Sequence, residues 1–149
     1  MNIDIKIIGI VRNDVIEPAR HNWKITQSEI VIDEAFTELL DGIEAFSHIS
    51  VLFWLHKITQ EQRLTIRVHP RRDETLPLQG VFATHTPTRP NPIGLTTVRL
   101  LERHNNILKV IGLDAINDTP ILDIKPFIPP LLSSEKVVLP EWVSEHERG

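Results

Sequence analysis

Short apolar segments punctuated by proline and asparagine constrain the fold of this chain more than any other feature. Segments 95–101 and 107–113 flank a polar turn at 104–106, which predicts a hairpin. Segment 49–55 is β-branched and aromatic, which predicts a strand buried on both faces. Further short strands are expected at 3–10 (with a bend, because the apolar parity changes after residue 7), 28–32, 66–68, 81–84 and 121–124. This series of about eight short strands predicts a barrel or a closed, twisted sheet.

Only one helix is expected beside these strands. Apolar residues at helical spacing cover 35–40, Asp33 stands at an N-cap position, and Gly42 follows the last turn. No glycine-rich turn joins a strand to a helix, which excludes the doubly wound fold. The sequence therefore predicts a mainly β, single-domain barrel over residues 1–126 with one short helix. Prolines prevent a regular strand or long helix over 127–149, so this tail is expected to pack on the barrel or on a dimer partner.

Composition narrows the class of protein. The chain has 149 residues and no cysteine, which excludes disulfides and thiolate metal sites and favours the cytoplasm. No apolar run approaches the ~20 residues of a membrane helix, and the N-terminus lacks a cleavage pattern for secretion. The net charge of −4 argues against broad affinity for nucleic acid.

Charge is distributed unevenly, however. Five basic residues and one acidic residue give segment 57–72 a charge of +4, which leaves −8 for the remainder of the chain. The five basic residues are Lys57, Arg63, Arg67, Arg71 and Arg72. Such a strip could hold a phosphate backbone at one place, or it could be a solvated loop. Spacing alone slightly favours the solvated loop.

A loop between residues 80 and 95, with the sequence GVFATHTPTRPNPIGL, carries the clearest chemical signal. Pro90 and Pro92 fix their own φ angles and restrict the residues before them, Arg89 and Asn91. The Arg89 guanidinium suits a carboxylate or phosphate, or alternatively a surface ion pair. Asn91 could read an adenine edge or brace the loop. A rigid connection between strands and a binding loop are both consistent with this pattern.

The run GVFATHTPTRPNPIGLTTVRL resembles the signature of the TrmO/TsaA-like family of S-adenosylmethionine-dependent tRNA methyltransferases, in a compact form without a further C-terminal domain. The likeness continues, in the family's order, through GIEAFSH at 42–48, FWLH at 53–56, LDAINDTP at 113–120 and DIKPF at 123–127. It implies an antiparallel barrel, S-adenosyl-L-methionine as cofactor, and N6-threonylcarbamoyladenosine beside the tRNA anticodon as methyl acceptor. It also implies a homodimer with cofactor sites close to the subunit boundary.

The resemblance also implies site residues. The cofactor would contact His56, Phe82, His85, Arg89, Asn91, Leu95, Leu113 and Asp114. His85 departs from the family, in which arginine is usual at that place. Asp123 and Lys125 would lie at the active face, with Asp123 as base and Lys125 contacting RNA or another substrate. Asx turns are the alternative explanation for the Asp and Asn residues between 114 and 123.

The sequence argues against metal catalysis. His48 and His56 are eight residues apart on one strand and therefore share a face, but no third ligand has suitable spacing. Two further functions remain open. One is a methyltransferase of the same fold that acts on a small molecule, which the acidic net charge and His85 favour. The other is a non-catalytic module that binds S-adenosylmethionine or RNA.

Overall fold

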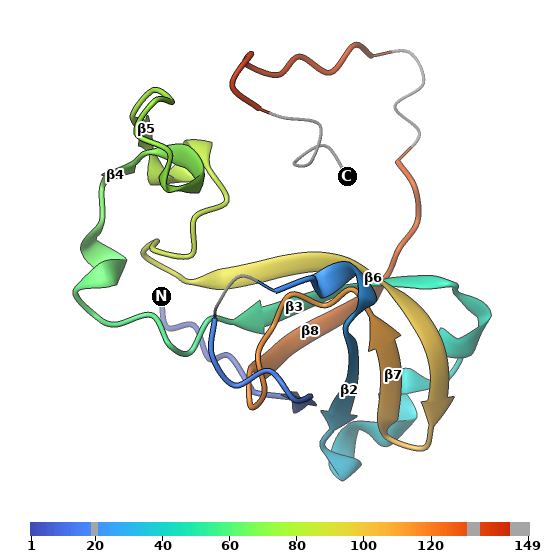
Figure 1. Cartoon of the computed structure of the whole chain (residues 1–149). Coiled ribbons are helices and arrows are strands. Elements are labelled where there is room, and N and C mark those ends of the chain that lie inside the picture. The colour runs from blue at the N-terminus through green and yellow to red at the C-terminus, as the bar shows by residue number, and fades with distance from the viewer. Residues whose placement is uncertain (19–20, 131–134, 144–149) are drawn as a thin grey trace.

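Six antiparallel strands close into a barrel in the computed structural model, which describes residues 1–18, 21–130 and 135–143 (Figure 1). The order around the barrel is β1-β2-β7-β6-β3-β8. These strands are β1 (Gly9–Arg12), β2 (Gln27–Ile32), β3 (His48–Trp54), β6 (Ile93–His104), β7 (Ile107–Ile111) and β8 (Pro120–Pro126). Two short strands, β4 (Arg67–Val68) and β5 (Gln79–Gly80), form a separate sheet. The antiparallel barrel predicted from the sequence is therefore confirmed.

Alternate residues of each strand fill the barrel. Ile49, Val51 and Phe53 of β3 are at most 2% exposed, and Val98 of β6 packs in the same core. The residues between them on β3 are partly or fully exposed. The prediction that 49–55 is buried on both faces is wrong, because a small barrel encloses only the inner face of each strand.

Helical structure is limited to 3-10 turns in the described part of the chain. The helix expected over 35–40 forms as η2 (Glu34–Leu40), where the Asp33 carboxylate accepts a hydrogen bond of 2.9 Å from the Ala35 backbone N–H. The other 3-10 helices are η1 (Trp23–Ile25), η3 (Ile43–Ala45), η4 (Gln62–Leu64), η5 (Pro70–Arg72) and η6 (Val81–Ala83).

Two predicted strands differ from the structure. Residues 3–7 are extended but lie outside the sheet, and the first strand begins only at Gly9. Segment 81–84 is a 3-10 turn, because both the backbone N–H and the hydroxyl of Thr84 donate to the Val81 carbonyl, at 3.2 and 2.9 Å. Because of that turn, the backbone pairing between β4 and β5 does not continue beyond the hydrogen bond from the Val81 N–H to the Ile66 carbonyl.

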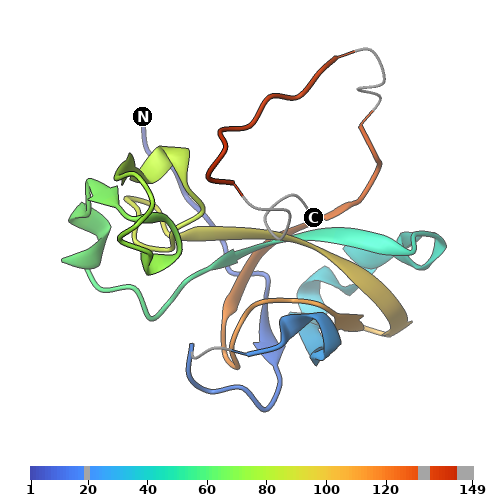
Figure 2. The same ribbon diagram turned by 45° about the horizontal axis from the view of Figure 1, so that its top comes forward.

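An excursion of the chain from 55 to 92 leaves the barrel after β3 and returns to it at β6. The Leu55 N–H donates to the Pro92 carbonyl at 2.8 Å and closes the base of this excursion. The tail begins where the Phe127 N–H donates to the His48 carbonyl at 3.1 Å. Excursion and tail both stand outside the β3–β6 pair in two views (Figure 1, Figure 2). The Arg71 guanidinium joins them by donating to the Trp142 carbonyl at 3.3 Å.

Candidate active site

The proline loop, defined here as residues 84–92, is fixed to the barrel from two sides. Pro92 is buried, and its carbonyl accepts from Leu55 at the end of β3. The Pro90 carbonyl accepts a 2.7 Å hydrogen bond from Nε of Arg63. Because the prolines themselves cannot donate backbone hydrogen bonds, these two accepted bonds set where the loop lies. The loop is thus held beside the edge formed by β3 and β6.

Arg63 is a site-forming residue that sequence reasoning missed. Its guanidinium lies 5.4 Å from the centre of the Trp54 ring on β3, which is within cation–π range. Its turn is closed by reciprocal hydrogen bonds between Thr59 and Gln62, of 2.9 and 3.1 Å. The sequence showed Arg63 only as one member of the basic strip, because its contact with Pro90 spans 27 residues. This arginine connects the barrel to the proline loop.

We expect Arg63→Lys to weaken binding of the cofactor proposed below by about tenfold, since an ammonium cannot both stack on Trp54 and donate along the Nε direction. Calorimetry would measure the affinity, and thermal melting would show whether the barrel remains intact. Arg67→Lys, an exposed change on β4, is the matched control and should leave the affinity as it is. Equal affinities for the two variants would show that Arg63 does not position the loop.

Arg89 points back into its own loop. Its Nη1 donates to the carbonyls of Thr84 and Thr86 at 3.0 and 3.1 Å. No ion pair found in the described part of the chain involves Arg89. The guanidinium therefore braces the loop through one nitrogen and retains N–H groups that could bind an anion. Asn91 and His85 are exposed on the same loop.

Strand register brings further predicted residues onto one outer face. Leu52 of β3 pairs with Leu95 of β6 on one side and with Asp123 of β8 on the other. Neighbouring strands lie ~5 Å apart, so Leu95 and Asp123 are separated by roughly 10 Å. Lys125 follows Asp123 on this face, and its Nζ lies 3.1 Å from Asp123 Oδ2. Leu95 and the Asp123–Lys125 pair therefore lie on the same outer face of the barrel.

Asp114 and Leu113 have different surroundings. Asp114 is exposed, and its carboxylate accepts a hydrogen bond from the hydroxyl of Thr96, the residue after Leu95. Leu113 is fully buried in the barrel core, so only its backbone could contact a ligand. Phe82 is 79% exposed on η6, and Leu95 is 66% exposed. Both side chains are therefore accessible to a ligand.

His56 follows the end of β3 and is partly buried. Burial lowers its pKa, nearby Lys57 lowers it further, and Asp118 acts in the opposite direction. The imidazole is therefore neutral at pH 7, and a neutral group next to a cationic ligand causes no repulsion. Among the described residues, no group of three or more His, Cys, Asp or Glu side chains could hold a metal ion.

Because the pKa of His56 is lowered in the folded chain, we expect the stability of the fold to depend on pH. Below about pH 6.5 an unfolded chain binds a proton at this imidazole more readily than the folded chain, so stability falls as the pH decreases. We expect melting temperatures between pH 7.5 and 5.5 to fall less steeply for His56→Gln than for the native chain. Parallel slopes for the two proteins would contradict this account of His56.

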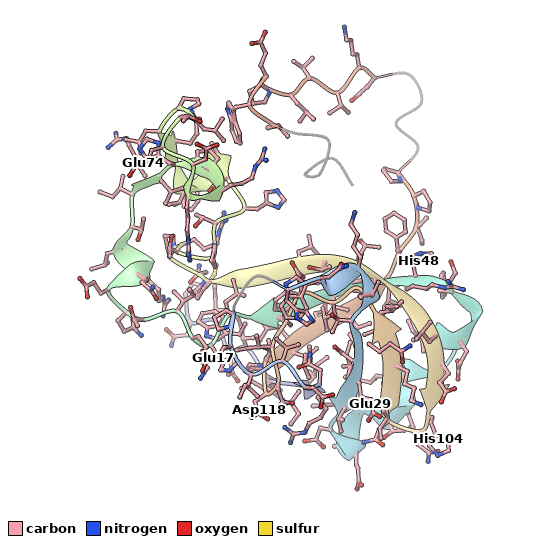
Figure 3. All side chains as sticks on the ribbon, viewed as in Figure 1. Glu17, Glu29, His48, Glu74, His104 and Asp118 are labelled. Carbon is pink, nitrogen blue, oxygen red and sulfur yellow. The ribbon has the colours of Figure 1, made fainter. Side chains whose placement is uncertain are left out.

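A polar hollow on the surface lies elsewhere. It has a volume of about 490 Å³, is open to solvent, and is lined by Arg12, Asn13, Asp14, Gln27, Ser28, Glu29, Lys109 and Asn117. None of these residues belongs to the predicted site. Figure 3 shows Glu29, which lines this hollow, below the β3–β6 pair. Glu74 marks the far end of the excursion in the same view.

Comparison with known proteins shows which family this barrel resembles. The family model described as tRNA-methyltransferase O N-terminal domain matches residues 17–131. A protein of Methanocaldococcus jannaschii named "Probable S-adenosyl-L-methionine-binding protein" is 46% identical, over 92% of this chain and 97% of its own length. The "tRNA (adenine(37)-N6)-methyltransferase" of Escherichia coli is 44% identical over 82% of this chain. A structure titled "Crystal structure of TrmO" superposes with a TM-score of 0.72 at 29% identity, over 92% of this chain.

The chain spans 56% of the Escherichia coli protein and 64% of that crystallised chain. Its closed barrel, with a proline loop pinned to the edge of β3 and β6, defines the class of protein as a small antiparallel β-barrel. Within that class, the chain belongs to the tRNA-methyltransferase O N-terminal domain family. The family resemblance seen in the sequence is confirmed.

Proposed function

We propose that the chain transfers a methyl group from S-adenosyl-L-methionine to N6 of N6-threonylcarbamoyladenosine beside the tRNA anticodon. Relatives in Escherichia coli and Homo sapiens are named for transfer to N6 of tRNA adenine 37, and several archaeal relatives for binding S-adenosylmethionine. One observation supports the proposal most strongly: the proline loop is pinned beside the edge of β3 and β6, and the strand register puts Leu95, Asp123 and Lys125 on one outer face.

The cofactor would be held by groups of matching charge. The Arg89 N–H groups that do not contact Thr84 and Thr86 would bind the carboxylate, and Asp114 would accept from the ammonium. Phe82 and Leu95 would supply apolar walls for the adenine, near the Asn91 amide, His85 and neutral His56. Leu113 would contribute through its backbone only.

Methyl transfer itself would rely chiefly on alignment. The C–S bond of the sulfonium breaks as the N–C bond to the acceptor forms, and the proton of the acceptor nitrogen goes to Asp123. Lys125, now paired with Asp123, would turn to an RNA phosphate when the tRNA binds. The cofactor would leave with an uncharged thioether in place of its sulfonium, so the positive charge on sulfur would be lost from the site.

A second copy would complete the site. Exposed large apolar residues lie on the excursion, on β6 and at the start of the tail: Leu78, Phe82, Leu95, Phe127 and Ile128. A second copy that covered them would remove this apolar surface from water, which favours association. The proposal therefore includes a homodimer, with residues 1–126 as the barrel domain and 127–149 packing on the barrel or the partner.

The proposed function also places the protein in the cytoplasm, where tRNA is modified. In the described part of the chain, no helix has the length and apolarity of a membrane span.

Calorimetry with S-adenosylmethionine, followed by transfer of a labelled methyl group to bulk tRNA, tests the function. We expect binding, and labelling that falls steeply with salt because phosphate contacts release counterions. A tRNA transcript without threonylcarbamoylation should not be labelled. Binding without labelling of any tRNA would favour a small-molecule acceptor or a sensor, and full turnover of Asp123→Asn would remove Asp123 as the base.

A further inference from the structure

The N-terminal arm, residues 1–7, pairs with no strand among the described residues. It makes no backbone hydrogen bond within the described part of the chain, and its anchor is Ile8, which donates to the Ile121 carbonyl at 2.9 Å. The arm leaves the barrel as an extended trace that joins no sheet (Figure 2). Ile3, Ile5 and Ile7 are 78%, 56% and 59% exposed. Because they alternate along an extended chain, all three lie on one face.

The arm is complementary to itself. When two copies run antiparallel about a two-fold axis at Ile5, Ile3 lies opposite Ile7, and Asp4 lies opposite Lys6 of the second copy. Each of the two opposed Asp4–Lys6 pairs then joins opposite charges. A slip of two residues in either direction would place Asp4 against Asp4 or Lys6 against Lys6. Like charges directly opposite are unfavourable, so the charges select one register.

An apolar hollow at the base of the arm supports the same register. The hollow has a volume of about 290 Å³ and is lined by Ile7, Gly9, Ile10, Val31, Ile32 and Asp33. In the register centred on Ile5, Ile3 of the second copy lies opposite Ile7 and therefore next to this hollow. Covering it would remove apolar surface on both chains from water, which favours association.

We propose that the N-terminal arms of two copies pair as an antiparallel ribbon centred on Ile5 and form one contact of the homodimer. The inference depends on the homodimer proposed above but not on the methyl-transfer chemistry. A ribbon of two strands is marginal alone, so it adds to the contact made by the excursion and tail faces. Its specific content is the register: residue 3 meets residue 7, residue 4 meets residue 6, and residue 5 meets itself.

The absence of cysteine allows a direct test of the register. Under mild oxidation, Ile5→Cys should form a disulfide-linked dimer, because opposed residues of paired strands are close enough for this bond. A mixture of Ile3→Cys and Ile7→Cys chains should give mainly the mixed dimer, while each alone should give little. Leu39→Cys, also exposed but outside the arm, is the control and should remain reduced. Equal cross-linking of all four variants would overturn the register.

Charge exchange provides the second test. Lys6→Asp places two pairs of like charges across the ribbon and should weaken dimerisation about tenfold by sedimentation equilibrium. The double variant Asp4→Lys/Lys6→Asp restores opposite charges and should recover the native affinity, which a merely misfolded arm would not do. A native dimer that Lys6→Asp leaves unchanged would overturn the arm inference alone. A monomeric native chain would overturn both the arm and the homodimer, while methyl transfer to tRNA is scored separately.

Discussion

Replacing Gly94 with alanine should destabilise the folded chain by about 3 kcal/mol, the largest effect on stability that we predict for a single methyl group. A Cβ at Gly94 would lie 2.3 Å from both Cε2 and Cζ of Phe53. Phe53 is 2% exposed and pairs with Gly94 across β3 and β6, so its ring has no room to retreat. A loss of this size lowers the melting temperature by roughly 10 °C. Thermal melting or urea unfolding would measure it.

Gly80→Ala is the matched control for this prediction. Gly80 has a φ of −61°, and the nearest atom to its added Cβ is 4.0 Å away. Alanine there should be neutral or stabilise the protein by up to about 1 kcal/mol. The double variant Gly94→Ala/Phe53→Leu should recover part of the loss, since leucine is smaller than the ring. If Gly94→Ala melts at the native temperature, the packing of β3 against β6 differs from this structure.

Replacing Arg89 with alanine should weaken binding of S-adenosylmethionine by about 100-fold, the largest effect on the site. The change removes a charge-assisted contact with the cofactor carboxylate, which contributes ~2–3 kcal/mol. It also releases the carbonyls of Thr84 and Thr86, which Arg89 holds at 3.0 and 3.1 Å, and so loosens the proline loop. Calorimetry at low salt would measure the affinity, and the melting temperature should change little because the loop lies outside the barrel core.

Two further variants test whether the loss of cofactor affinity depends on the charge and on the planar shape of Arg89. Arg89→Lys keeps the charge but loses the planar fork, and should bind with intermediate affinity. Arg99→Ala removes an exposed arginine further along β6, opposite His48, and should bind as the native chain does. An Arg89→Ala protein with native affinity would place the cofactor away from the proline loop.

The strands and their closure could be predicted from sequence because their signals are local. Alternating apolar residues define β2, β3 and the β6–β7 hairpin, and the polar turn before Ile107 defines their connection. The errors arose where periodicity alone does not decide the structure. A local hydrogen bond from Thr84 to Val81 makes segment 81–84 a 3-10 turn, and residues 3–7 have strand periodicity but no neighbouring strand in the described part of the chain. Periodicity predicts an extended backbone but does not supply the partner.

The site was only partly predictable for the same reason. The prolines around Asn91 identified the loop, and the family resemblance named the residues around it. The clamp made by Arg63 joins two segments that no periodicity relates, so the sequence showed only a basic residue. Likewise, the alignment of Leu95 with Asp123 depends on the order of β6, β3 and β8 in the barrel, which the sequence alone did not establish.

A crystal structure with bound S-adenosylmethionine tests the central claim most directly. We expect the cofactor to lie between the proline loop and the start of β6, with its carboxylate at Arg89 and its ammonium at Asp114. Electron density for the cofactor in the polar hollow beside Arg12 and Lys109, with the surface next to the proline loop empty, would contradict it.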